Sequence, residues 1–326
     1  MYSPEGDLTP KYGGPDPAEI AVGSDRIART IATGKPFFIG RNGSTEQDAL
    51  HFWFTRRKVG GAPWPYAITQ NLHLGAGIWP KTDASFDAWA KEYMETLGLL
   101  DGLAAGWYRP LADSESALLD FAAPNAFRTP LRSLEPYYAI PNHRWTRHLV
   151  GKKVAVVSSF ADTIAKQTGD SVQMHSIWRG LEEPETILPF STTWVPIRTY
   201  FTKEVSQGDM TEWPMSLHNW DQAADYIVKK VVASGASIAL IGCGGLGMII
   251  GGRLRKAGIS VVVLGGAIQV LFGIKGRRWA SHEIISKFWG PAWVWPDESE
   301  TPTGSFHIEG ACYWKLGGSR PSTTPR

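Results

Sequence analysis

The stretch Ser237-Ile238-Ala239-Leu240-Ile241 is a short apolar run that leads directly into Gly242-Cys243-Gly244-Gly245-Leu246-Gly247. An apolar run of this length before a glycine cluster predicts a buried strand, and the residues that follow predict a helix ending near Ala257. The chain then returns to a β-branched run at Ile259–Leu264. Because a strand, a crossover helix and a second strand form a parallel βαβ unit, we predict an α/β fold. Its sheet is expected to be Rossmann-like, mostly parallel and flanked by helices.

The same alternation precedes this unit in the second half of the chain. Val154–Ser158 is β-branched and predicts a strand, followed by a helix over Ala161–Gln167. A further strand is predicted at Glu185–Pro189. In Asn219–Ala233 the apolar residues recur at helical spacing, so we expect a helix with one buried face.

The first half is less regular. Pro36–Ile39 predicts a short strand, and Ser44–Thr55 predicts a helix directly after it. The density of Pro, Gly and Trp between about Gly60 and Pro80 indicates irregular structure. Ala84–Leu100 is expected to form a strongly amphipathic helix.

Composition narrows the class of protein. The chain has 326 residues, of which 43% are hydrophobic and 20% charged, as in ordinary globular domains. Its net charge of +2 is too balanced to argue for a nucleic-acid partner. Two cysteines, Cys243 and Cys312, supply no disulfide framework, which suits a reducing compartment, and we expect a cytoplasmic protein.

We expect one folded domain between two unstructured ends. Residues 1–25 are interpreted as a flexible N-terminal arm, because their start is polar, rich in Pro and Gly and unlike a signal peptide. Residues 26–315 are interpreted as a single catalytic domain with halves 26–150 and 151–295. Residues 316–326 read as a disordered tail.

One uncharged run of 18 residues, Ala257–Ile274, is long enough for a membrane helix. It contains Gly265, Gly266 and Gln269, and its first half is β-branched. A buried strand followed by a short helix explains these residues better than a membrane span, so we predict no transmembrane segment.

The first candidate site is the loop Gly40–Glu46, where the predicted strand passes into a helix N-terminus. Arg41 and that N-terminus suit phosphate oxygens, and Glu46 suits a proton acceptor, a sugar hydroxyl or a metal ion. The alternative is structural: Ser44 and Gln47 have the spacing of a capping box, and Glu46 favours the positive end of a helix.

Two further loops follow predicted strands, where ligands sit in doubly wound sheets. Ser158 and Phe160 belong to a loop whose hydroxyls suit either helix capping or ligand binding. The segment Gly242-x-Gly244-x-x-Gly247 fits the dinucleotide fingerprint. That fingerprint expects an acid at the end of the next strand, which here ends in Gly265 and Gly266 without one.

The fourth loop begins with this glycine pair and continues through Gln269 to three cations beside Trp279. The cations are Lys275, Arg277 and Arg278. Together these residues suit a phosphorylated, ring-bearing ligand, although the cations also fit an ordinary solvated face. Glu309, near the end of the ordered part, is a second candidate carboxylate. No nucleophile elbow, Walker A sequence, HExxH helix or Asp-x-Asp pair occurs in the chain.

Two of these stretches together resemble the GT-D fold glycosyltransferases, formerly a domain of unknown function. The family signature Arg-x-Gly-Asp-Gly-Glu is similar to Arg41-Asn42-Gly43-Ser44-Thr45-Glu46, in which Ser44 replaces the aspartate. The family's late strand, glycine-rich loop, helix and strand are similar to residues 238–266. The continuation to Trp279, with Glu309–Trp314, resembles an uncharacterised subgroup encoded beside surface-polysaccharide genes.

The resemblance implies transfer of a hexosyl or pentosyl group from a nucleotide-diphosphate donor, a UDP-sugar favoured, to a carbohydrate hydroxyl in glycan synthesis. It implies that Arg41, Lys275, Arg277 and Arg278 hold the diphosphate. Glu46 would serve the acceptor or a divalent cation, Mn²⁺ or Mg²⁺, whose use Ser44 leaves open. The residues implied to approach the nucleotide sugar are Gly43, Ser44, Ser158, Phe160, Gly242, Cys243, Gly244, Gly245, Gly265, Gly266 and Gln269.

Two other functions remain open at this point. An NAD(P)-dependent oxidoreductase would use the GxGxxG loop, and a non-catalytic carbohydrate-binding protein would use the 15 tryptophans. Oligomeric state is not determined by these residues.

Overall fold

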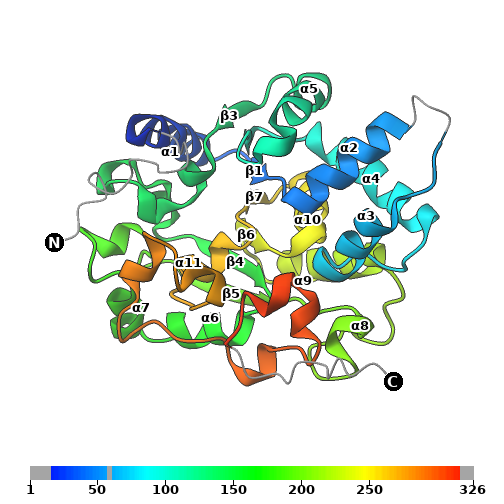
Figure 1. The fold of residues 1–326 in the computed structure, drawn as a ribbon. Helices are drawn as coiled ribbons and strands as arrows, with labels where there is room; N and C mark the ends of the chain where they lie inside the picture. The colour runs from blue at the N-terminus through cyan, green and yellow to red at the C-terminus, as the bar shows by residue number, and fades with distance from the viewer. Residues whose placement is uncertain (1–15, 57–60, 316–326) are drawn as a thin grey trace.

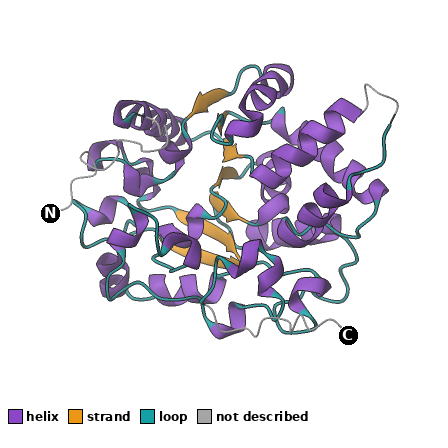
Figure 2. Ribbon diagram, viewed as in Figure 1, coloured by secondary structure: helices purple, strands orange, loops and turns teal. Residues whose placement is uncertain are grey.

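The computed structural model describes residues 16–56 and 61–315. Seven parallel strands form one sheet with the order β3-β2-β1-β7-β6-β4-β5 (Figures 1 and 2). The strands are β1 (Phe38–Arg41), β2 (Gly102–Ala104), β3 (Phe127–Thr129), β4 (Lys153–Ser158), β5 (Thr193–Arg198), β6 (Ile238–Gly242) and β7 (Ser260–Val263). The predicted α/β class with a parallel sheet is therefore confirmed.

Helices cover both faces of the sheet (Figure 2). They are α1 (Pro17–Ala32), α2 (Ser44–Arg56), α3 (Tyr66–Gln70), α4 (Asp83–Leu97), α5 (Ala112–Ala122), α6 (Ala161–Thr168), α7 (Ser171–Ile177), α8 (Lys203–Ser206), α9 (Trp220–Ala233), α10 (Gly247–Lys256) and α11 (Ala267–Leu271), with a π-helix at Asn71–Gly75. Short 3₁₀ turns make up much of the remaining chain.

The core consists of two apolar layers, one on each face of the sheet. Successive side chains of a strand point to opposite faces, so Ile238 and Leu240 of β6 enter one layer while Ala239 and Ile241 enter the other. The first layer contains side chains of α1, α6, α7 and α11, and the second contains those of α2, α4, α5, α9 and α10. Burial on both faces explains why the strands are continuously apolar rather than alternating.

The predicted βαβ unit is present as β6, α10 and β7, with Ile238 opposite Ser260 and Ile241 opposite Val263. The strand predicted at Glu185–Pro189 is wrong. Residues 184–186 form a 3₁₀ turn after Glu183, whose φ of 45° is left-handed. The strand is β5, six residues long, which carries Pro196. Proline is tolerated there because β5 is an edge strand and needs no ladder hydrogen bond on its outer side.

Two expectations about irregular segments need correction. The predicted N-terminal arm extends too far, because α1 begins at Pro17 and buries Ile20 and Ser24. Asp16 starts this helix by accepting a hydrogen bond of 3.0 Å from the Ala18 N–H. Residues 1–15 and the expected tail 316–326 lie outside the described part of the chain.

The segment between about Gly60 and Pro80, which was expected to be irregular, contains α3 and the π-helix at residues 66–75.

The uncharged run 257–274 folds as β7 followed by the five-residue α11, as predicted. Within residues 16–56 and 61–315, no helix has the length and apolar character needed to cross a membrane.

Helix α10 packs on the sheet through Gly251. A β-carbon on this glycine would lie 2.6 Å from the Phe38 ring of β1 and 3.3 Å from Val261 of β7. Replacing glycine by alanine in an exposed helix stabilises it by about 1 kcal/mol, whereas overpacking a core costs about 1–3 kcal/mol. We expect the cost of overpacking to exceed the gain in helix propensity. Gly251→Ala should therefore lower the free energy of unfolding, measured by urea titration, by about 1–2 kcal/mol.

Gly180→Ala is the matched control, because a β-carbon there would meet nothing within 4 Å. Equal stability of the two variants would contradict this account of how α10 docks.

Candidate functional site

A cleft opens at the carboxyl ends of the central strands. β1 and β7 are neighbours, with Phe38 opposite Val261, but α2 leaves β1 toward one face while α11 leaves β7 toward the other. Strand ends whose connections diverge in this way create a crevice, the usual ligand site of open parallel sheets. Here the crevice has a volume of about 530 Å³.

Loops from distant parts of the sequence line this cleft together. Of the seventeen residues that the sequence nominated, fourteen lie in its wall: Arg41, Gly43, Ser44, Glu46, Ser158, Phe160, Gly242, Cys243, Gly244, Gly265, Gly266, Gln269, Arg278 and Glu309. Rossmann-like sheets collect the loops after parallel strands at one edge, which is why residues more than 200 positions apart meet here.

Arg41 is the cation at the centre of the cleft. Its guanidinium lies over the Trp107 ring, 4.3 Å from the centroid. Burial lowers the pKa of Arg41, and the carboxylates of Glu46 and Glu135 act in the opposite direction. A β-carbon on Gly265 would lie 3.5 Å from Arg41 Nη1, so the guanidinium sits against the turn that follows β7.

Arg278 lies on the other side of that turn. A β-carbon on Gly266 would be 3.5 Å from Arg278 Nη1. The side chain donates to the Tyr313 hydroxyl at 2.7 Å and to Glu309 Oε2 at 2.6 Å. Burial opposes the charge of Arg278, but Tyr313 and Glu309 outweigh burial and raise its pKa. Two guanidinium groups thus flank a diglycine turn, which is a suitable arrangement for a diphosphate.

Glu46 is the buried carboxyl group of the cleft, with 7% of its surface exposed. It lies in the first turn of α2, and a β-carbon on Gly43 would lie only 1.8 Å from its Oε2. Glycine at position 43 therefore makes room for the carboxyl group. Burial raises the pKa of Glu46, while its own backbone N–H and Arg41 act to lower it. A carboxylate with a raised pKa is a better proton acceptor near neutral pH.

The capping-box alternative is not observed. Gln47, which would complete the box, is buried, and both polar atoms of its amide lack a hydrogen-bond partner among the described residues. The α2 N-terminus is thus not closed by its own side chains in the way that the Ser44–Gln47 spacing predicted.

A buried hydrogen-bond network holds the loop that carries Arg41 and Glu46. Asn42, 1% exposed, accepts from the Tyr93 hydroxyl at 3.0 Å and donates to Glu115 Oε1 at 2.8 Å. Glu115 Oε2 accepts from the Gly106 N–H at 2.8 Å, and Trp107 Nε1 donates to the Asn42 carbonyl at 3.1 Å. Sequence reasoning missed these residues, because no local pattern joins Asn42 to a glutamate 73 positions later.

The glycine-rich loop after β6 serves close packing. A β-carbon on Gly242 would lie 2.6 Å from the Gly265 carbonyl oxygen, so the loops after β6 and β7 touch through their backbones. Gly244 has a left-handed φ of 46°. Burial raises the pKa of the Cys243 thiol to about 12, although a hydrogen bond with Thr199 acts to lower it, so this cysteine is no thiolate nucleophile near neutral pH.

Three nominated residues do not line the cleft. Gly245 instead donates its N–H to Ala76 and accepts from Trp89 Nε1, both at 2.9 Å, and so fixes the packing of α4. The Lys275 ammonium lies 5.6 Å from the centre of the Trp289 ring. Arg277 donates to the Gly310 carbonyl at 3.0 Å. Two of the three predicted phosphate-binding cations of this loop therefore have structural contacts elsewhere.

Two polar residues of the cleft wall are engaged by the protein itself. Ser158 Oγ accepts from the Phe160 N–H at 3.2 Å, and Gln269 donates to the carbonyls of Lys275 and Tyr313.

The N-terminus of α6, which follows this loop, is capped by a distant residue. Glu300, fully buried, accepts from the Asp162 N–H at 2.7 Å and from Thr163. The loop hydroxyls therefore do not cap α6, as one alternative expected, and Glu300 takes that place.

The rim of the cleft contains a run of left-handed backbone. Glu309, Gly310 and Ala311 have φ values of 46°, 65° and 60°. Such conformations strain residues other than glycine and persist only where the surrounding structure enforces them. Here Arg277 and Arg278 hold the segment through Gly310 and Glu309.

The carboxyl groups of the cleft do not form a cation site of their own. Within the described residues, no three His, Cys, Asp or Glu side chains are grouped so that they would hold a metal ion.

Comparisons of the chain with protein-family models, with curated proteins and with solved structures found no match.

Asn42→Ala should destabilise the protein by about 2–4 kcal/mol, because Glu115 and Tyr93 would each lose a buried partner. The pKa of Glu115, already raised by burial, should rise further. A group with a raised folded-state pKa binds protons more tightly in the folded protein, so stability is lost as pH rises through that pKa. In urea titrations, Asn42→Ala should therefore lower the free energy of unfolding more at pH 8 than at pH 5.

Asn142→Ala is the control, since Asn142 is exposed. If Asn42→Ala lowers the free energy of unfolding only slightly, or by the same amount at both pH values, then the hydrogen bonds of Asn42 do not stabilise the protein in the way described.

Proposed function

We propose that this chain is a glycosyltransferase that uses a nucleotide-diphosphate sugar and a carbohydrate acceptor. The observation that carries the proposal is the pair Arg41 and Arg278 on either side of the Gly265–Gly266 turn, with the buried Glu46 in the same cleft. A diphosphate needs cations on two sides, and an acceptor hydroxyl needs a proton acceptor. The cleft supplies both groups, and the sequence resemblance points to the same reaction.

The transfer would proceed as follows. The acceptor oxygen forms a bond to the anomeric carbon while the bond between that carbon and the diphosphate oxygen breaks. The electron pair of the broken bond leaves with the diphosphate, whose charge Arg41 and Arg278 stabilise. The proton of the acceptor hydroxyl passes to Glu46. The scheme itself requires no divalent cation; one that entered with the donor would be held by the diphosphate oxygens and Glu46, because Mg²⁺ is usually bound through one or two carboxylates together with substrate phosphates.

The proposal includes the finer expectations from the sequence: a UDP-sugar as donor, polysaccharide or glycan synthesis as the pathway class, and a cytoplasmic location. The last agrees with two cysteines that are both free.

Thermal-shift measurements on the purified chain test the donor. UDP, GDP, CMP, their sugar conjugates and NAD(P)(H) are compared with and without Mn²⁺. A ligand at 100 times its dissociation constant stabilises a protein by about 2.7 kcal/mol, and we expect one nucleotide-diphosphate family to do so. Stabilisation by NAD(P) alone would replace the proposal by an oxidoreductase. A flat response across the panel would favour the non-catalytic carbohydrate binder.

Glu46→Gln should lower turnover by about 10²–10⁴-fold and leave nucleotide binding unchanged, since it removes the proton acceptor but keeps the shape of the side chain. In the unmodified enzyme, activity should rise with pH through the raised pKa of Glu46, because only the ionised form accepts a proton. Rates of sugar transfer measured between pH 5 and 9 check both points.

Glu95→Gln, on an exposed position of α4, is the control for a lost glutamate charge. If Glu46→Gln keeps full turnover, then Glu46 is not the base.

Glu309→Gln should tighten binding of a nucleoside diphosphate by about two- to fivefold. Glu309 now pairs with Arg278, and a partly exposed ion pair contributes up to about 1 kcal/mol that an incoming phosphate must replace. Calorimetric titration measures the affinity, with the exposed Glu298→Gln as control. Weaker binding in Glu309→Gln would mean that Glu309 itself contacts the ligand.

A further inference from the structure

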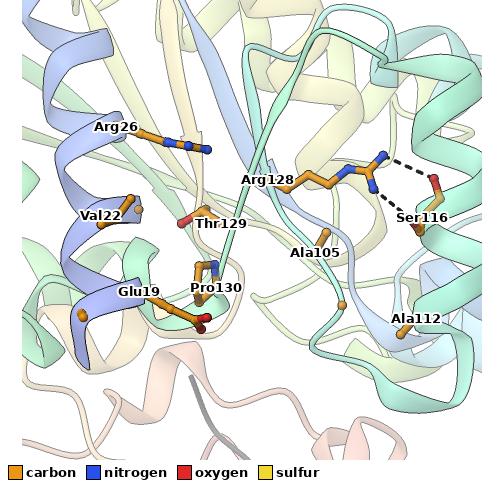
Figure 3. A pocket seen from close by; sticks show the side chains of 12 residues that line it. Glu19, Val22, Arg26, Ala105, Ala112, Ser116, Arg128, Thr129 and Pro130 are labelled. Atoms are coloured by element: carbon orange, nitrogen blue, oxygen red, sulfur yellow. Dashed lines mark hydrogen bonds between the residues drawn. The ribbon is translucent and has the colours of Figure 1, made fainter. Parts of the chain in front are cut away.

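One end of the cleft lies beyond β3, an edge strand of the sheet. It is lined by residues that follow β3 and by residues that follow α11: Leu131, Arg132, Glu135, Trp279 and His282. Arg128 of β3 does not belong to this end, because it lies in the pocket between α1 and α5 and donates there to Ser116 Oγ at 2.8 Å (Figure 3). No step of the proposed transfer uses His282, although it lines the same cleft.

One nitrogen of the His282 ring is committed to the protein. Nδ1 lies 3.2 Å from the backbone nitrogens of both Ile284 and Ile285, at the start of the 3₁₀ turn Ile285–Phe288. A backbone N–H can only donate a hydrogen bond, so Nδ1 is the acceptor of both and carries no proton. In the neutral ring the proton is therefore on Nε2, which is a hydrogen-bond donor.

The charges around His282 keep its ring neutral. Burial lowers the pKa of His282, and the Arg132 guanidinium acts in the same direction, while the carboxylates of Glu135 and Glu283 oppose them. Within residues 16–56 and 61–315, Nε2 has no hydrogen-bond partner, and the His282 side chain is partly exposed where it lines the cleft. His282 thus offers the cleft an unpaired, uncharged N–H.

Trp279 connects His282 to the arginine at the rim. The Trp279 and His282 rings meet edge to face, with 5.9 Å between their centroids, and the Arg278 guanidinium lies 5.2 Å from the centroid of the Trp279 ring. A group attached to a diphosphate on Arg278, and directed toward β3, therefore meets Trp279 and His282 next.

The aromatic rings at this end suit a sugar better than a nucleobase. A guanidinium already lies over each of the two tryptophans, Arg41 over Trp107 and Arg278 over Trp279. Less ring surface is left for a base to stack on. A sugar hydroxyl needs only a donor or an acceptor of a hydrogen bond, and a neutral N–H of fixed direction is such a donor.

We propose that the β3 end of the cleft holds the sugar of the nucleotide-sugar donor, and that His282 Nε2 donates to one of its hydroxyl oxygens. The inference rests on the proposed function, because it takes the diphosphate to lie on Arg41 and Arg278. The nucleoside then extends toward β5 at the opposite edge of the sheet, where Tyr200 and Phe201 line the cleft. His282 is thus a substrate-binding residue.

Two amide substitutions separate binding from the capping of the 3₁₀ turn. His282→Asn keeps an acceptor near the position of Nδ1 but is too short to reach that of Nε2, whereas His282→Gln places an N–H donor near Nε2 and loses the cap. His282→Asn should weaken UDP-glucose or UDP-N-acetylglucosamine about three- to tenfold, the loss of one hydrogen bond, and leave UDP affinity unchanged. His282→Gln should bind both UDP-sugars within about twofold of the unmodified protein.

Calorimetric titration of the full chain measures these affinities, with the exposed His218→Asn as control. GDP and GDP-mannose take the place of the uridine nucleotides if guanine is the preferred base. If no nucleotide binds the unmodified protein, the proposed function fails and the sugar subsite fails with it. If nucleotides bind, but His282→Asn weakens UDP as much as its sugars or changes neither, only the role of His282 is overturned. Weaker binding in His282→Gln alone would mean that His282 only caps the turn.

The proton on Nε2 is tested without any ligand. Two-bond ¹H–¹⁵N spectra of the histidine-labelled protein near neutral pH should show one ring protonated on Nε2 alone, whose signals are missing in His282→Asn. A proton on Nδ1, or on both nitrogens, would overturn the assignment of Nε2 as a neutral donor. Thermal midpoints of the unliganded variants show that each one folds.

Discussion

The Asn42 side chain holds the functional end of this molecule together. It is buried between Tyr93 of α4 and Glu115 of α5, and the backbone carbonyl of Asn42 accepts from Trp107 Nε1. Without these bonds the turn from β1 to α2 would present unpaired polar groups to the core, which folded proteins avoid. The bonds fix where Arg41 and Glu46 project. The network also reaches the loop after β2, because Glu115 accepts from the Gly106 N–H.

Close approach of backbones is the second constraint on the cleft. Gly242 lets the loop after β6 touch the Gly265 carbonyl, and Gly43 lets the Glu46 carboxyl group fold against the backbone. Residues with a β-carbon would separate these loops. The fingerprint-like spacing of the glycine-rich loop is therefore explained by packing and by the left-handed φ of Gly244, without a dinucleotide.

Burial determines how readily the charged groups of the cleft ionise. Burial disfavours the ionised forms of both Arg41 and Glu46. The Glu46 carboxylate opposes this effect at Arg41, whereas the backbone N–H of Glu46, and then Arg41, oppose it at Glu46. Arg278 differs, because Glu309 and Tyr313 already satisfy it at the rim. A ligand phosphate must compete with Glu309 for Arg278, whereas the Arg41 guanidinium lies over the face of Trp107 and its Nε donates to the Asn42 backbone carbonyl at 3.4 Å.

Local pattern alone determined the elements: apolar runs marked β4, β6 and β7, and helical periodicity marked α4 and α9. Because the loops after parallel strands converge at one edge of the sheet, Arg41, Glu46 and Arg278 could be predicted to share one ligand site. Periodicity failed at β5, where an edge position tolerates Pro196. Only the tertiary structure decided which polar groups pair. In it Lys275 contacts the Trp289 ring, Glu300 accepts hydrogen bonds from the α6 N-terminus 137 positions away, and Asn42 donates to Glu115. The reason is physical: strand and helix periods are properties of neighbouring residues, whereas the partner of a buried polar group is chosen by the packing of segments far apart in the chain.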